Sequence, residues 1–326
     1  MAINSTGQPD YILALLQDFS WNQYNGEYLN ITFNYEGLSD SQKEVFDHAF
    51  SSFSNVANIN FENISTTADL MIDIKNLSNG LNGVVYSYVD YNNVYNNDSD
   101  YNQLLRAYLY IDDDFADSQV GNYGYYIMLH ELGHALGLDH AFEGANNLGE
   151  DSSLEATLMA YPSGYVDGSI TQLTDVMPIG PMIYDIAALQ FLYGANTDHN
   201  NGNNTYSLNG VDSLDGNDYS KDMNHLSYKF NYVGETIWDA GGDDTIDASE
   251  YNGNAVIDLR EGLDYYTHVG QTKIWNAFGS NIENAIAGSG NDVIYGNDLD
   301  NILKGGLGVD SYYFYGDNFG IDTIYD

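Results

Sequence analysis

The sequence predicts a chain in two parts, an α+β part over residues 1–195 and an all-β part over residues 196–326. In the first part, segments with the hydrophobic period of a helix alternate with short strand-like segments. No helical pattern occurs between residues 200 and 326, where short apolar pairs alternate with Gly, Asp and Asn. The composition changes at about residue 195, so we expect a domain boundary there.

Four segments of the first part are expected to be helices, namely residues 11–19, 39–53, 123–136 and 181–194. Ser39 can act as the N-cap of the second segment, and Gly137 ends the third. The fourth has Pro181 near its start and Gly194 as its C-cap. Strands are expected at residues 29–35, 59–64, 70–74 and 106–111. The stretch 80–102 is rich in Asn, Gly, Tyr and Asp, so we expect long loops there.

The composition excludes several classes of protein. The 326 residues include 48 acidic and 8 basic side chains, giving a formal net charge of -40, and no cysteine. Hydrophobic residues make up 43%, enough for packed cores. A disulfide scaffold is impossible, no apolar run is long enough to span a membrane, and eight cations cannot form a nucleic-acid-binding face. The acidity occurs in both parts, so we expect a solvated acidic surface and a monomer.

Nine-residue repeats occupy the end of the second part. Three units follow one another without a gap, AGSGNDVIY (287–295), GNDLDNILK (296–304) and GGLGVDSYY (305–313). A fourth, DNFGIDTIY (317–325), follows a slip that we expect to break its register. The units match the calcium repeat G-G-x-G-x-D-x-U-x, in which glycines turn backbone carbonyls toward the ion and Asp supplies charged oxygen. The alternative is a series of metal-free β-turns, which the strict register disfavours.

The strongest motif is HELGHALGLDH, residues 130–140. His130 and His134 lie four residues apart on a helix, so both imidazoles leave the same face. Gly137 permits a turn that returns His140 to the same metal ion. Three imidazoles leave a zinc position open for water, as a catalytic site requires, and Glu131 is placed to act on that water. The alternative is a surface helix that merely contains histidines, which the extended motif makes improbable.

Outside this motif, Met159 in LMAYPSGY (158–165) fits a methionine turn beneath a three-histidine zinc site. The remaining histidines stand alone in the sequence, and we expect them to be surface or structural residues. They are His48, His199, His225 and His268.

These residues resemble those of the serralysins, secreted bacterial zinc metalloproteases of the metzincin clan and peptidase family M10. The resemblance runs in order through HELGHALGLDH, Met159 to Tyr161, DIAALQFLYGAN (185–196), WDAGGDDTID (238–247) and NIENAIAGSGNDVIYGN (281–297). It implies a metzincin catalytic domain over residues 1–195 and a calcium-binding RTX parallel β-roll over residues 196–326. It also implies that the protein is a zinc-dependent endopeptidase that cleaves peptide bonds in proteins.

The resemblance assigns roles to individual residues. It implies one catalytic zinc ion bound by His130, His134 and His140, with Glu131 as the general base. It implies that Tyr161 is a further zinc ligand at rest, which moves away to hydrogen-bond the tetrahedral intermediate. An extended peptide substrate is expected to add as a strand along residues 106–111.

The resemblance also implies several structural calcium ions, whose expected ligands fall into three sets. The first set is Asn200, Gly202, Asn204, Asp239, Gly241 and Asp244; the second is Gly242, Asp244, Asn281 and Glu283. The third is Gly288, Gly290, Asp292, Gly305, Leu307 and Asp310. The Gly, Asn and Leu residues would act through their backbone oxygens.

The chain departs from the family pattern in several places. Pro162 follows Tyr161 where Trp is usual, and Ala141 follows the third histidine where Pro is common. We expect no long propeptide, and no Sec signal peptide is recognisable at the N-terminus. The chain ends at Asp326, whereas relatives usually carry further repeats and a signal for a type I exporter. Either the chain is truncated or its export differs.

The expected function is therefore that of a secreted, extracellular enzyme acting on protein or peptide substrates, with the type I secretion machinery as a further partner. Two other functions fit the sequence less well. A calcium-binding adhesin with an inactive protease half is disfavoured because Glu131 and the three histidines are all present. A cytosolic zinc protease with one partner is disfavoured by the calcium repeats.

Overall fold

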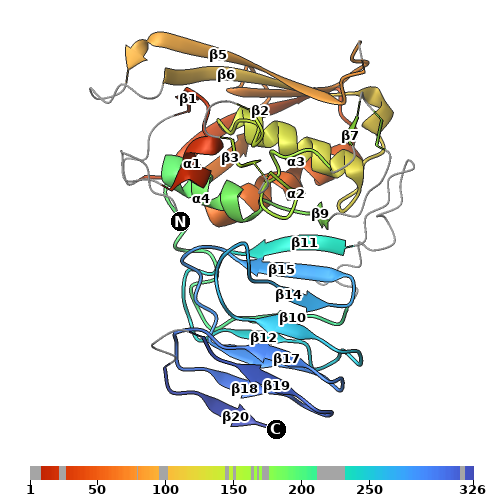
Figure 1. The fold of residues 1–326 in the computed structure, drawn as a ribbon. Coiled ribbons are helices and arrows are strands. Elements are labelled where there is room, and N and C mark those ends of the chain that lie inside the picture. The colour runs from red at the N-terminus through yellow and green to blue at the C-terminus, as the bar shows by residue number, and fades with distance from the viewer. Residues whose placement is uncertain are drawn as a thin grey trace.

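The structure is a computed structural model of the chain. It describes residues 9–21, 27–78, 80–94, 102–143, 147–149, 152–162, 165–166, 169–170, 176–210, 232–315 and 320–326. The expected fold class is confirmed, with an α+β half followed by a parallel β-roll (Figure 1). Within the described residues, no helix combines the length and the apolar character needed to cross a membrane.

The first half contains a six-stranded sheet in the order β1-β6-β4-β2-β3, with β5 paired to β6. Its strands are β1 (Phe19–Ser20), β2 (Leu29–Glu36), β3 (Ile59–Asn63), β4 (Leu70–Ile74), β5 (Gly83–Val94) and β6 (Asn102–Ile111). All pairings are parallel except that of β5 with β6. The antiparallel β5 therefore forms one edge of the sheet.

The expected loops over residues 80–102 were a wrong prediction, because β5 covers Gly83–Val94. Its alternating Val and Tyr side chains fit a half-buried strand, although the Asn and Asp residues around them indicated loops. The substrate strand expected at residues 106–111 also needs correction. This part of β6 pairs with β5 on one side and with β4 on the other, so it has no free edge.

Helices pack beneath this sheet (Figure 1). They are α1 (Asp10–Ala14), α2 (Asp40–Val56), α3 (Tyr123–Ala135) and α4 (Ile183–Tyr193), with a short 3-10 turn, η2 (Asp113–Phe115). Ser39 and Gln42 form a capping box at the start of α2, and Gly194 is the C-cap of α4. Along the chain, α3 and α4 are separated by three short strands, β7 (Tyr165–Val166), β8 (Ser169–Ile170) and β9 (Val176–Pro178).

The fully buried carboxylate of Asp185 ties the start of α4 to the segment around Met159. Its Oδ1 accepts a hydrogen bond from Thr157 Oγ1 at 2.5 Å. Its Oδ2 accepts from the backbone N–H groups of Leu158 at 2.7 Å and Met182 at 2.9 Å. Since Leu158 also contacts the metal-binding motif through its carbonyl, this carboxylate supports the site from below.

The second half contains two sheets, in the orders β10-β12-β16-β18-β20 and β19-β17-β13-β14-β15-β11-β9. The strands of the first sheet are β10 (Thr205–Ser207), β12 (Thr245–Asp247), β16 (Asn284–Ile286), β18 (Ile302–Lys304) and β20 (Thr323–Tyr325). Those of the second are β11 (Tyr232–Ile237), β13 (Val256–Asp258), β14 (Thr267–Val269), β15 (Thr272–Asn276), β17 (Val293–Tyr295) and β19 (Ser311–Tyr313). In the repeat region, successive strands alternate between the two sheets.

The repeats stack two units apart. Ile294 pairs with Tyr312 across β17 and β19, and Ala285 pairs with Leu303 across β16 and β18. At the large apolar position of the repeat, Ile294 and Leu303 are fully buried, whereas Tyr312 is half-buried and Ile324 of the last unit is exposed. The slip before the last unit does not break its register, contrary to expectation. β20 pairs in parallel with β18, and Asp322 Oδ1 accepts from the Asn301 backbone N–H.

The two halves share a sheet. The short strand β9 leaves the first half and pairs in parallel with β11, the adjacent strand of the β-roll. Val176 and Met182 pack against the fully buried Trp275 behind this junction. Lys273 also forms an ion pair with Glu155 at 2.7 Å. These contacts hold the β-roll directly against the base of the first half.

Replacing Asp185 tests how much its carboxylate stabilises the segment that contacts residues 130–140. Asp185→Ala should lower the free energy of unfolding by at least about 2 kcal/mol, because two buried N–H groups lose their acceptor. Asp185→Asn should lose less, since one amide oxygen can keep both N–H bonds. Urea denaturation of the full chain in calcium measures the difference, with Glu62→Gln on exposed β3 as the control. An alanine variant as stable as that control would contradict this expectation.

Candidate metal centre and active-site cleft

Helix α3 places His130 and His134 one turn apart on the same face. The chain then turns at Gly137, whose φ of 91° is in the left-handed region. A Cβ at this position would also lie 2.8 Å from the carbonyl oxygen of Phe19, so a larger residue would not fit. The turn returns His140 to the two helical histidines.

The Nε2 atoms of the three imidazoles converge. His140 Nε2 lies 3.1 Å from His134 Nε2 and 3.3 Å from His130 Nε2. One nitrogen from each ring lies within 4.8 Å of the others, close enough to share one cation. Burial lowers the pKa of His130 well below its usual value and that of His134 to about 4, which keeps both rings neutral.

The opposite nitrogen of each ring has an acceptor. His130 Nδ1 donates to the Leu158 carbonyl at 2.7 Å, and His134 Nδ1 donates to the Leu138 carbonyl at 2.8 Å. His140 Nδ1 lies 3.2 Å from Glu143 Oε1. With the protons on Nδ1, the Nε2 lone pairs are free to bind a metal ion. The residues present therefore fit a three-histidine zinc site with room for further ligands.

Glu131 lies beside this centre and is only 8% exposed. Burial raises the pKa of its carboxyl group to about 8, so the group is poised to exchange a proton near neutrality. The backbone of Gly83, at the start of β5, packs directly on this side chain. A Cβ on Gly83 would lie 2.5 Å from Glu131 Cγ, so only glycine fits here.

Tyr161 closes another side of the centre. Its hydroxyl lies 3.1 Å from His140 Nε2, and its side chain is 41% exposed. Met159 is fully buried beneath α3, where its Sδ would be 2.7 Å from a Cβ built on Gly133. Its carbonyl accepts from the Ala141 N–H, which links the methionine segment to the chain after the third histidine.

A cleft of about 770 Å³ runs over the three-histidine centre. One wall is the edge strand β5, with Gly83, Val84, Val85 and Ser87. The other wall contains residues 16–19, and Glu131, His134, His140 and Tyr161 line the centre. Among the described residues, the edge of the sheet next to the candidate catalytic groups is formed by β5, and not by residues 106–111.

Several members of the first two expected calcium sets contact one another in the β-roll. Asp244 Oδ1 accepts from the Asn204 N–H, and its backbone N–H donates to Glu283 Oε2. Asp239 and Asp244 are both buried, and burial together with the Asp239 and Glu283 charges raises the pKa of Asp244 to about 6. The Gly202 carbonyl lies against Gly242, where a Cβ would be 2.5 Å from its oxygen. The Gly241 N–H donates to the Asp239 carboxylate. Of the other expected ligands, Asn200 has a positive φ of 48°, and Asn281 is exposed.

The third set bridges two turns of the β-roll. The Leu307 N–H donates to the Gly288 carbonyl, and the Asp292 N–H donates to Asp310 Oδ1. Gly305 packs against Asp310, and Gly290 lies opposite Gly308. Oδ2 of Asp310 and Oδ2 of Asp244 are buried without a hydrogen-bond partner among the described residues. Such oxygens suit a cation, because burying an unpaired carboxylate oxygen is otherwise costly.

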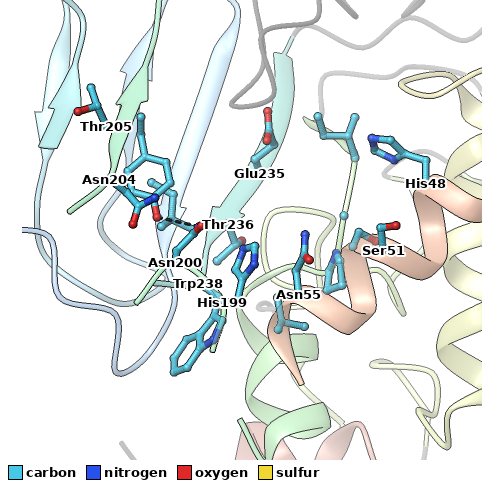
Figure 2. A pocket seen from close by; sticks show the side chains of 17 residues that line it. His48, Ser51, Asn55, His199, Asn200, Asn204, Thr205, Glu235, Thr236 and Trp238 are labelled. Atoms are coloured by element: carbon cyan, nitrogen blue, oxygen red, sulfur yellow. Dashed lines mark hydrogen bonds between the residues drawn. The ribbon is translucent and has the colours of Figure 1, made fainter. Parts of the chain in front are cut away.

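A second cleft, of about 390 Å³, lies between α2 and the β-roll (Figure 2). His48 lines it from α2 and His199 from the segment before β10. His48 Nδ1 lies 2.7 Å from the Tyr125 hydroxyl, and His268 Nε2 lies 3.1 Å from the Gly270 carbonyl. Among the described residues, no group of three acidic or histidine side chains close enough to share a cation lines this cleft. The fourth isolated histidine, His225, falls outside the described residues.

Several residues of the site were not predicted from the sequence. Gly83, which is far from Glu131 in the sequence, packs directly on the side chain of this catalytic candidate. Gln17 Nε2 donates to the Leu138 carbonyl, the same oxygen that orients His134. Glu143 Oε1 lies 3.2 Å from His140 Nδ1, and the Phe142 ring stacks on the His140 ring with centroids 4.9 Å apart. Only the last two had a signal, their closeness in sequence to the third histidine.

Comparisons with known proteins agree with this architecture. The Matrixin family model matches residues 20–146, and the model of the peptidase M10 serralysin C-terminal region matches residues 195–321. Serralysin from Proteus mirabilis is 32% identical over 291 residues, covering 82% of this chain and 56% of that protein. Metallopeptidase AprA from Pseudomonas marginalis is 33% identical over 298 residues, covering 84% of this chain and 59% of that protein.

The chain spans a little over half the length of these relatives. Both of its halves are nevertheless represented, in the order seen in the structure, by two models of the same peptidase family. The chain therefore belongs to the serralysin-type M10 metalloprotease family.

Proposed function

We propose that the protein is a zinc-dependent endopeptidase that cleaves peptide bonds in proteins. The observation that carries this proposal is the convergence of three Nε2 atoms beside a buried carboxyl group, in a cleft bordered by a free strand edge. His130, His134 and His140 would hold the zinc ion, with Tyr161 as a further ligand at rest. A zinc ion bound there would supply Lewis-acid chemistry, polarising the scissile carbonyl and the attacking water.

The chain's own residues would carry out the remaining steps. The free edge of β5 would hold an extended peptide by main-chain hydrogen bonds, with its scissile bond over the three-histidine centre. Glu131 would accept the proton of the attacking water and deliver it to the leaving amine. The Tyr161 hydroxyl would move away from His140 and donate a hydrogen bond to the oxyanion.

We also propose that residues 1–195 form the catalytic domain and that residues 196–326 form a β-roll stabilised by several calcium ions. The crowded Asp239, Asp244 and Glu283 carboxyl groups, and the unpaired oxygens of Asp244 and Asp310, support this proposal. Calcium dependence would suit a secreted, extracellular protein, because the β-roll would order only where calcium is abundant. Release by a type I exporter and a monomeric state remain part of the proposal.

Glu131→Gln tests the catalytic role. The variant should keep its zinc content but lose hydrolysis of casein and of a quenched fluorescent peptide by at least about 100-fold, because an amide cannot act as a base. Glu62→Gln provides the matched charge control. Turnover by Glu131→Gln at the wild-type rate would overturn the assignment, and the absence of activity in the wild type would favour the adhesin alternative.

Gly83→Ala tests the contact between β5 and the general base. The added Cβ must displace the Glu131 side chain, so kcat should fall by about 10-fold or more while zinc content is retained. Gly180→Ala is the matched control, because a Cβ there would lie 3.6 Å from Ser52 Cβ, an ordinary contact. Equal kinetic constants for the two variants would contradict the placement of Glu131.

Calcium removal tests the β-roll. Excess EGTA should lower the melting temperature and expand the chain, because the buried carboxylates then repel one another. Circular dichroism and small-angle scattering of the full chain measure both effects, and returning calcium, but not magnesium, should reverse them. An unchanged melting curve and radius in EGTA would count against structural calcium.

A further inference from the structure

The three imidazoles of the metal centre are not held in the same way. His130 donates to the backbone carbonyl of Leu158, and His134 donates to that of Leu138. Leu158 and Leu138, which supply these carbonyls, are both fully buried in the core. The Nδ1 atom of His140 instead faces Glu143 Oε1 at 3.2 Å, and the Glu143 side chain is 57% exposed.

The neighbouring carboxylate does not share this role. Asp139 Oδ1 accepts from the backbone N–H of His140 at 2.9 Å, so it binds the main chain and leaves the imidazole to Glu143. Phe142 covers the His140 ring from the side, stacked at an interplanar angle of 16°. Phe142 also contacts Tyr161, with ring centroids 4.7 Å apart. Side chains of one short segment thus orient the third histidine.

We propose that Glu143 is a positioning residue for zinc binding. Its carboxylate keeps the His140 proton on Nδ1, aims Nε2 at the other two histidines and increases the electron density of the ring. Carboxylate acceptors of this kind raise the basicity of a ligand and its affinity for metal. The inference rests on the proposed function, because it assumes that the three histidines bind zinc.

Zinc affinity measured against a competing chelator tests this role. Glu143→Ala should weaken zinc binding by about 10- to 100-fold, the range found when such a partner of a metal ligand is removed. Glu143→Gln should lose less, because its amide oxygen can still accept the N–H. Glu62→Ala removes the same charge from a distant exposed site and should leave affinity unchanged. Equal affinities for Glu143→Ala and Glu62→Ala would overturn the proposal.

A second measurement does not require the metal. Nitrogen-15 spectra of the zinc-free protein report which ring nitrogen carries the proton. In the wild type, all three rings should be protonated at Nδ1. Glu143→Ala should leave His130 and His134 unchanged and give His140 a mixture of tautomers, whereas an unchanged His140 would contradict the proposal.

The two measurements separate the failure of this inference from that of the proposed function. If the wild type takes up zinc and has its activity while Glu143→Ala binds zinc equally well, only the positioning role is overturned. If the wild type binds no zinc, the zinc-peptidase assignment and this inference both fail. Unchanged melting temperatures of the zinc-free variants would show that altered affinity does not reflect misfolding.

Discussion

Hydrogen bonds donated by the Nδ1–H groups of three histidines are the constraint on which the candidate site depends. They leave three Nε2 lone pairs directed at one point, which isolated imidazoles would not do. Two of the acceptors are backbone carbonyls that the fold holds in place from different segments. The site is therefore only as well ordered as the packing of those segments against α3.

That packing is maintained by buried polar contacts as well as by the core. Asp185 binds the segment around Met159 to the start of α4, and the Trp21 indole and Tyr193 hydroxyl donate to carbonyls at the end of α3. Each contact satisfies a group that would be costly to bury unpaired. The same groups that stabilise the fold thus also limit how far the histidines can move.

The β-roll meets this half through a shared sheet and not through a flexible connection alone. The pairing of β9 with β11, and the packing around Trp275, make the first half an end cap for the stacked strands. The acidic groups concentrated in the turns are a separate feature, because without cations they repel. Most of the net charge of -40 lies outside the proposed ligand sets and suits a solvated surface.

The sequence by itself determined the fold class and three of the four helices, because hydrophobic periodicity and glycine placement are local properties. The helix expected at residues 11–19 was predicted too long, since α1 ends at Ala14 and Phe19 begins β1. The sequence also pointed to His130, His134 and His140, which lie within eleven residues, and the structure brings their Nε2 atoms together. Only the tertiary structure decided that residues 83–94 form the free edge strand and that Gly83 packs on Glu131. Strand pairing and close backbone approach join residues far apart in the chain, and no local pattern records them.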